Sequence, residues 1–219
     1  MKNPVNLSPT TELIPLLTII LVIVGSFYFY THFPEQVPMH WNYQGEIDSY
    51  SNKMVGAFMI PAIMIVSYLT FLIIPLIDPK AERYSQFQKT YHVFKAIIIG
   101  YFALIYFYIG LVGLGYQIPI NIVVPLSIGV LFLIIGNYLS KIKPNWFIGI
   151  RTPWTLSNEK VWNQTHRFGG KIFVAMGLIT ILGAFLPNQI YWRIFIVSII
   201  SGVTLIMIYS YLSYRKINS

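Results

Sequence analysis

Residues 54–77 read MVGAFMIPAIMIVSYLTFLIIPLI, a stretch of 24 residues without a charged side chain. A helix of about 20 apolar residues is long enough to cross the hydrocarbon core of a bilayer. The whole chain has the same character, because 56% of its 219 residues are hydrophobic and 10% are charged, against about a quarter charged in a soluble domain. We therefore expect an integral membrane protein. The composition excludes intrinsic disorder, and the absence of cysteine excludes a disulfide scaffold.

Apolar runs of similar length recur along the chain and predict six transmembrane helices. Their approximate limits are residues 13–30, 54–77, 96–116, 122–139, 172–186 and 194–214. The predicted fold class is an all-α polytopic membrane protein. It divides into an N-terminal three-helix module, residues 13–116, and a C-terminal three-helix module, residues 117–214. Each module carries one long loop, residues 31–53 and residues 140–171.

The basic residues are distributed unevenly over the two sides of this arrangement. If the six spans alternate in direction, 13 of the 15 Lys and Arg residues lie on one side, and only Lys53 and Arg193 lie on the other. Cytoplasmic loops of membrane proteins carry an excess of Lys and Arg. We therefore expect both termini and the loop 140–171 in the cytoplasm, and the loop 31–53 outside. The net charge of +8 then reports orientation, and no direct nucleic-acid partner is expected.

Ionisable side chains are missing from the six predicted spans, although Glu12 and Asp78 stand at their edges. Proton relays and coupled ion sites of transporters normally need such groups at membrane depth. Their absence disfavours an ion-coupled transporter.

The outer loop 31–53 is predicted to contain a small β-hairpin. Val37, Met39 and Trp41 alternate with polar residues, and the segment 42–45 supplies turn residues. Its histidines and acids match no established ligand spacing, so no metal site is expected. With three acids and one lysine, the loop is better suited to contact a cationic peptide.

The inner loop 140–171 is longer than a connection between two helices requires. Pro153 excludes one continuous helix, and Ser157 is expected to cap a short second helix. Gly169 and Gly170 are expected to let the chain turn into the fifth span. On the short helix, three residues share one face that is expected to lie on the membrane surface: Val161, Thr165 and Phe168.

Two interpretations of this loop's charged residues stay open. In the first, four residues bind a phosphate or a lipid headgroup, namely Arg151, Lys160, His166 and Arg167, and Glu159 with His166 forms an acid–base pair. In the second, which the composition favours, the same residues only anchor the loop, and Arg151 bonds loop carbonyls. The sequence contains no nucleophile elbow, phosphate-binding glycine loop or paired carboxylates, so neither an enzyme nor a cofactor is expected.

Specific residues of the inner loop resemble the signature of the SdpI family of bacterial membrane immunity proteins. They are Gly136, Asn137, Gly149, Arg151, Thr152, Pro153, Trp154, Thr155, Leu156, Trp162, Thr165, His166 and Gly170. The outer loop resembles the N-terminal membrane module that usually precedes this signature, through Pro34, Pro38, His40, Trp41, Asn42, Gly45 and Asp48. Together the resemblance extends over residues 13–210.

The resemblance implies a six-helix protein of the bacterial cytoplasmic membrane that protects its producer from a secreted peptide toxin. It also implies a role as a toxin sensor that sequesters a transcriptional repressor at the membrane. The candidate toxin contacts are His40, Trp41, Asn42, Gly45 and Asp48. The candidate inner signature residues, for repressor capture or signal transmission, are Asn137, Gly149, Arg151, Thr152, Trp154, Trp162, His166 and Arg167.

The expected partners are thus the toxin, a repressor and membrane lipids. Two other functions stay open. One is a membrane enzyme or transporter that handles an anionic lipid-like substrate at the inner loop, and the other is a purely structural membrane partner.

Overall fold

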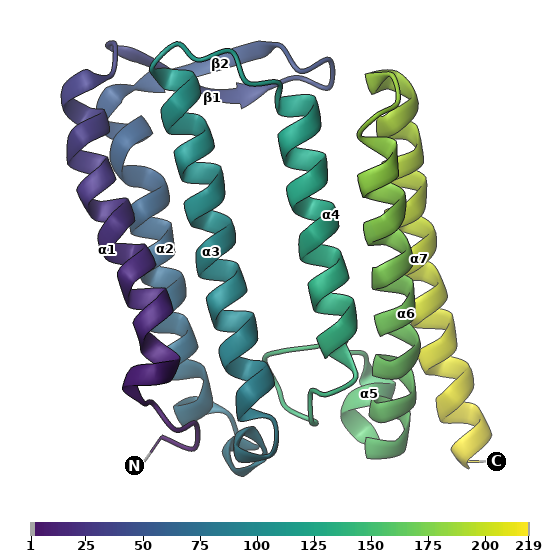
Figure 1. Ribbon diagram of the computed structural model, residues 1–219. Helices are drawn as coiled ribbons and strands as arrows, with labels where there is room; N and C mark the ends of the chain where they lie inside the picture. The colour runs from purple at the N-terminus through teal and green to yellow at the C-terminus, as the bar shows by residue number, and fades with distance from the viewer. Residues whose placement is uncertain (1–2, 219) are drawn as a thin grey trace. The chain divides into compact units, whose positions relative to one another are not determined.

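The computed structural model describes residues 3–218 of the chain, and its elements are labelled in Figure 1. In chain order they are α1 (Pro9–His32), β1 (Gln36–Trp41), β2 (Ile47–Asn52), α2 (Lys53–Ile77), the 3-10 helix η1 (Ala81–Gln86), α3 (Gln88–Gly113), α4 (Ile120–Leu139), α5 (Pro153–Ser157), α6 (Glu159–Gly183) and α7 (Asn188–Asn218). The chain forms two compact units. One comprises residues 7–72 and 95–124, and the other comprises residues 73–94 and 125–218 together with the N-terminal segment 3–6.

Five of the helices are long and apolar enough to cross a membrane: α1, α2, α3, α4 and α7. They correspond to five of the six predicted spans, although α3 ends three residues before the predicted limit of its span. The remaining predicted span, 172–186, falls largely in the second half of α6, whose first half carries charged side chains such as Glu159 and Arg167. The helical membrane character is therefore confirmed, and the sixth crossing stays a prediction.

The unit that contains α1 is organised around aromatic and branched side chains. Val22, Ile99 and Tyr106 are fully buried. The Tyr106 hydroxyl lies within hydrogen-bond distance of the Ala57 carbonyl oxygen at 3.0 Å and of Ser26 Oγ at 3.1 Å, so its polar end has partners inside the core. Large apolar residues on the outer faces, for example Val24 at 63% exposure, remain uncovered by protein. Such exposed apolar surface is what a lipid-facing helix presents.

The helices extend beyond the predicted apolar runs and thereby include charged residues. Glu12 lies in the first turn of α1, and Lys95 lies within α3, where it is 1% exposed. The Lys95 ammonium contacts the two Glu12 carboxylate oxygens at 2.5 and 2.6 Å, and the Tyr68 hydroxyl donates to the same carboxylate at 2.8 Å. The sequence placed these charges outside the spans. The structure compensates them by mutual pairing, which a buried charge requires.

The unit that contains α6 and α7 has these two helices side by side, as Figure 1 shows. The Phe168 ring of α6 stacks on the Tyr209 ring of α7 with centroids 4.2 Å apart. On its other side, α6 meets α4 at glycines. A Cβ added to Gly136 would lie 2.7 Å from the Gly170 carbonyl oxygen, so the two backbones touch there. Small residues permit this kind of close helix approach in membrane proteins.

Three expectations about the inner loop are wrong. Ser157 ends α5, and the N-cap of the next helix is Asn158, whose side-chain oxygen accepts from the Lys160 and Val161 amides. Helix α6 continues without a turn through Gly169 and Gly170 to Gly183. The face with Val161 and Thr165 is fully buried in protein rather than lying on a membrane surface. The helix continues through these glycines because Gly170 packs against Gly136 of α4, where a side chain would not fit.

Candidate functional site

The predicted outer hairpin is confirmed as an antiparallel pair of β1 and β2. Its register pairs Val37 with Ser51 and Trp41 with Ile47, with irregularities between Pro38 and Trp41. Val37 is fully buried and fixes the hairpin on the helices of its own unit, because its side chain fills the space above Gly56 and Gly113.

The hairpin turn is built by one asparagine and one glycine. The Asn42 side-chain oxygen accepts hydrogen bonds from the Gln44 amide at 2.9 Å and the Glu46 amide at 3.1 Å. Gly45 has φ 84°, a left-handed conformation that glycine adopts without steric cost. The Asn42 amide group donates to the Glu46 carboxylate at 3.1 Å. These two candidate residues therefore shape the turn.

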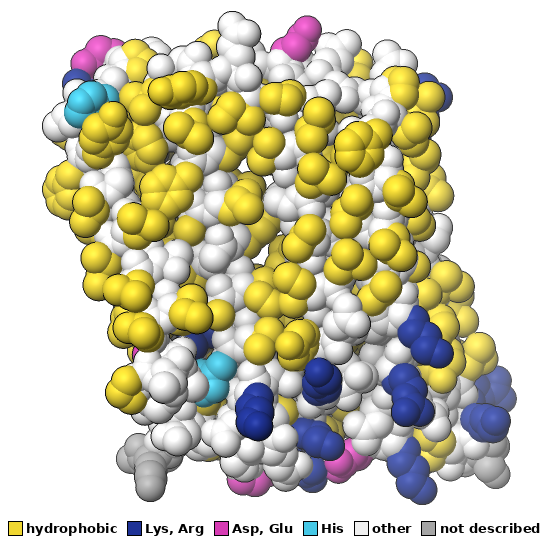
Figure 2. All heavy atoms as spheres, in the orientation of Figure 1, with side chains coloured by type: hydrophobic (Ala, Val, Ile, Leu, Met, Phe, Trp, Pro, Cys, Tyr) yellow, Lys and Arg dark blue, Asp and Glu magenta, His cyan; other side chains and the backbone are white. Residues whose placement is uncertain are grey.

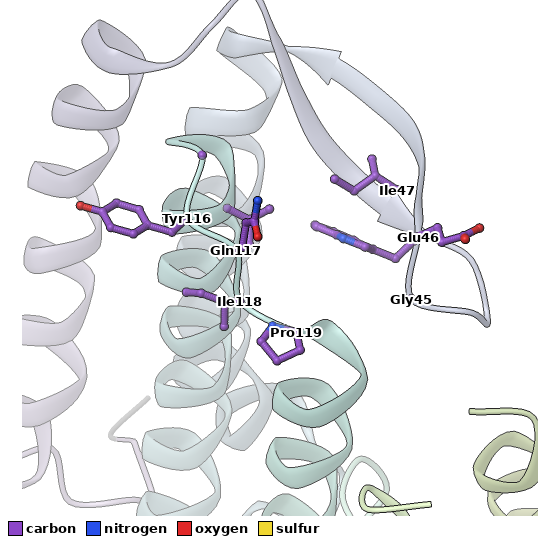
Figure 3. Close-up of a pocket in the computed structure, with 10 residues that line it drawn as sticks. Gly45, Glu46, Ile47, Tyr116, Gln117, Ile118 and Pro119 are labelled. Atoms are coloured by element: carbon purple, nitrogen blue, oxygen red, sulfur yellow. The ribbon is translucent and has the colours of Figure 1, made fainter. Parts of the chain in front are cut away.

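A cavity of about 530 Å³ lies between the end of the hairpin and the segment that joins α3 to α4. Figure 3 shows Ile47 on the hairpin side and Gln117, Ile118 and Pro119 on the opposite side. Trp41 also lines it, and its indole lies 5.9 Å from the Tyr108 ring. The cavity is mainly apolar, while the Glu46 carboxylate points away from residues 116–119. Its volume is within the range of small-ligand sites, which accommodate a few side chains of a peptide.

The remaining outer candidates form pairs instead of a ligand cluster. His40 Nδ1 lies 2.6 Å from the Asp48 carboxylate, and both side chains are exposed. Lys53 pairs with Glu35 at 2.7 Å. Among residues 3–218, no three His, Asp or Glu side chains converge as metal ligands. Trp41 and Gly45 thus border the cavity, whereas His40 and Asp48 brace the strands beside it.

The inner loop is held to the segment after α2 by buried polar residues that the sequence did not single out. Asp78 is 4% exposed, and its carboxylate accepts from the Tyr84 hydroxyl at 2.8 Å and from the Trp146 amide at 3.0 Å. Burial, with the neighbouring Asp78 carboxylate, raises the pKa of Tyr84 well above its usual range. Asn145 is fully buried and bonds four backbone groups of residues 143–148. The position of Asp78, an acid directly after the apolar run 54–77, is the one sequence signal for these buried hydrogen bonds.

His166 occupies the centre of the inner signature and is fully buried. Its Nδ1 lies 2.8 Å from the Trp162 carbonyl oxygen, and its Nε2 accepts from the Ile150 amide at 3.0 Å. This arrangement requires the neutral ring with its proton on Nδ1. Burial lowers the pKa of His166 to about 4, which agrees with a neutral ring. Both nitrogens are engaged, so no acid–base pair with Glu159 exists, and Glu159 instead pairs with Arg83 at 3.2 Å.

Two further signature residues surround His166. Gly149 has φ 114°, and a Cβ there would clash with His166 Nε2 and contact the Trp162 ring. Trp162 is fully buried, its ring stacks on His166 with centroids 4.0 Å apart, and its indole N–H donates to the Ile142 carbonyl at 2.8 Å. Trp162 therefore supports the loop from inside instead of lying at a water interface.

Thr152 connects the inner loop to α7. It caps α5, accepting from the Thr155 amide at 3.1 Å, and its hydroxyl lies 2.6 Å from Ser210 Oγ. Trp154 packs on Tyr211 with ring centroids 5.2 Å apart. Arg151 is exposed, and its guanidinium donates to the Trp146 carbonyl at 2.7 Å, as the anchoring interpretation predicted. Most inner signature residues thus stabilise the loop structure, and Arg151 lies on the loop's exposed surface.

Asn137 and Arg167 are not part of this cluster. Asn137 lies in α4 and donates to the Leu133 carbonyl at 2.7 Å, and Arg167 lies on an exposed face of α6. Both line a separate cavity between these two helices. Of the four residues that the sequence groups as a phosphate cluster, His166 is buried with both ring nitrogens bonded to backbone, so it offers no donor to a phosphate beside the exposed Arg151, Lys160 and Arg167.

Comparisons with known proteins agree with these features. Residues 141–210 match the model of the SdpI/YfhL protein family, and residues 16–65 match a domain of unknown function (DUF1648). The chain is 27% identical over 207 residues to the Immunity protein SdpI of Bacillus subtilis (strain 168), and this alignment covers 94% of the chain and 97% of that protein. No solved structure matches the chain. Taken with the signature residues of the inner loop, these matches support the resemblance of the chain to the SdpI family.

Proposed function

We propose that this protein is an immunity protein that protects the cell producing it against a secreted, membrane-active peptide toxin. The observation that carries the proposal is the match over almost the whole chain to a protein named an immunity protein. The match covers 94% of the chain, so it includes both the outer hairpin and the inner loop.

The outer cavity is the proposed contact site for the toxin. A peptide that inserts into a membrane must expose apolar side chains, and Trp41, Ile47 and Ile118 offer an apolar lining at the end of the hairpin. Glu46 stands at the edge of the cavity and attracts a basic group on the same peptide. The proposed orientation places this end outside the cell and both termini in the cytoplasm, because 13 of 15 basic residues then lie inside.

The proposed work is binding rather than catalysis. The one buried histidine of the inner signature uses both ring nitrogens for backbone hydrogen bonds, so it has no free position for proton transfer to a substrate. For the regulatory role that the family resemblance implies, the exposed Arg151 is the proposed surface residue for capture of a repressor.

The test is survival of toxin-sensitive cells that express the protein and its cavity variants. Ile47→Asp places a charge in the lining, and Gln117→Trp fills the space; both residues are exposed, so we expect normal membrane abundance with reduced survival. Tyr43→Ala is the matched control, because Tyr43 lies at the hairpin turn, is 55% exposed and does not line the cavity. Full protection by both cavity variants, or equal loss in the control, would argue against the cavity as the contact site.

A further inference from the structure

The cavity between α4 and α6 has a floor made of backbone. It has a volume of about 360 Å³ and is lined by Asn137 and Ser140 on one side and by Arg167, Lys171 and Val174 on the other. Gly136 and Gly170 form the floor, since a Cβ on either would lie 2.7 Å from the other's carbonyl oxygen. The close contact of the two helices thus leaves a shallow groove with cationic side chains at its edge.

The polar part of this lining is suited to an anion. Arg167 and Lys171 are four residues apart on α6 and therefore share one face. Neither makes an ion pair within residues 3–218, whereas Arg83, Lys53 and Lys95 each have a carboxylate partner. No Asp or Glu lines the cavity, and the Ser140 hydroxyl adds a further donor. A guanidinium, an ammonium and a hydroxyl on one small surface match the oxygens of a phosphate group.

The position of the cavity along the helices indicates an amphipathic ligand. Lys171 is the last charged residue before the uncharged stretch 172–186, and α4 is uncharged throughout 120–139. The cavity therefore joins a cationic edge to an apolar wall that includes Val174. Figure 2 shows that most of the Lys and Arg side chains visible on this face gather at one end of the helices. Basic pockets between transmembrane helices at the cytoplasmic boundary are suited to anionic headgroups.

We propose that this cavity binds the phosphate group of an anionic phospholipid, with Arg167 and Lys171 as the phosphate contacts and an acyl chain along Val174. The site does not depend on the toxin-binding role, because it involves none of the residues of the outer cavity. It holds a lipid against the helix pair whose inner ends carry the family signature.

The experiment measures which lipid the purified full-length protein retains. Protein in nanodiscs of equimolar phosphatidylglycerol and phosphatidylcholine is released into native mass spectrometry, and bound lipids are counted. We expect selective retention of phosphatidylglycerol, which falls by roughly thirtyfold in Arg167→Gln/Lys171→Gln, since each of the two cations near a membrane surface contributes on the order of 1 kcal/mol. The matched control is Lys89→Gln/Arg215→Gln, which removes the same charge from exposed positions outside the cavity and should retain the lipid.

A second variant distinguishes loss of the lipid site from misfolding of the double variant. Ser140→Trp fills the cavity without changing charge at an exposed position, so it should lose the lipid while the elution volume stays that of the wild type. Unchanged phosphatidylglycerol retention in both variants, or equal loss in the control, would overturn the site. Displacement of the lipid by millimolar inorganic phosphate would overturn the assignment to a lipid in favour of a soluble phosphate, and retention in that buffer would support the lipid.

Discussion

At the scale of single residues, His166 shows how burial fixes a protonation state. Its two nitrogens bond the Trp162 carbonyl and the Ile150 amide, and an added proton on Nε2 would replace an acceptor with a donor facing that amide. The same interior excludes a Cβ at Gly149. The signature residues at the centre of the loop therefore pack against and hydrogen-bond one another, and these contacts explain why these residue types occur there.

This burial predicts a specific pH dependence of stability. Because the pKa of His166 is lowered to about 4 in the folded protein, from about 6.5 when unfolded, its contribution to stability is complete above about pH 6.5 and is lost as the pH falls towards 4. The loss should amount to about 3 kcal/mol over that interval. Thermal unfolding in detergent between pH 7 and pH 4 measures it, and His166→Gln should show a flatter slope. Identical slopes in both proteins would refute a neutral buried His166.

At the scale of elements, the inner loop combines a rigid frame with an exposed surface. Asn145 supplies the frame, since it is fully buried and bonds four backbone groups, while Arg151 is exposed and makes one bond to a carbonyl. Asn145→Ala should lower the unfolding free energy by about 2 kcal/mol or more, because buried backbone groups lose partners, and membrane abundance should fall.

Arg151→Ala should keep membrane abundance normal and impair only immunity or signalling. Immunoblots of membrane fractions, together with survival assays, distinguish the two variants. An equal loss of abundance in both would show that Arg151 has a structural role.

The predictable elements were those whose signals are local. The uncharged stretch 54–77 corresponds closely to α2, and the alternation at Val37, Met39 and Trp41 before turn residues corresponds to β1 and its turn. Helix α6 was divided wrongly at Gly169 and Gly170, because the sequence does not show that Gly136 of another helix requires a neighbour without a side chain. The sequence does not show that Ile150 bonds His166 or that Trp146 bonds Asp78, because these partners lie 16 and 68 residues away along the chain.

At the scale of the whole molecule, the charge distribution predicts a topology that can be measured directly. The chain contains no cysteine, so the reaction of a single introduced cysteine with a thiol reagent shows on which side of the membrane that residue lies. Gln44→Cys in the hairpin turn should react with a membrane-impermeant maleimide in intact cells, and Ser157→Cys at the end of α5 should react only after permeabilisation. The reverse labelling pattern would show that the protein has the opposite orientation. Labelling of both sites in intact cells would show that an even number of helices crosses the membrane between them.

The central claim is that this protein preserves the membrane of the cell that makes it. The most direct test follows membrane potential with a potential-sensitive dye in toxin-sensitive cells during challenge with the secreted peptide. Cells that carry the wild-type protein, confirmed in the membrane fraction, should keep their potential, whereas cells with an empty vector or with Gln117→Trp should lose it. Collapse of the potential at the same rate with and without the inserted wild-type protein would contradict the claim.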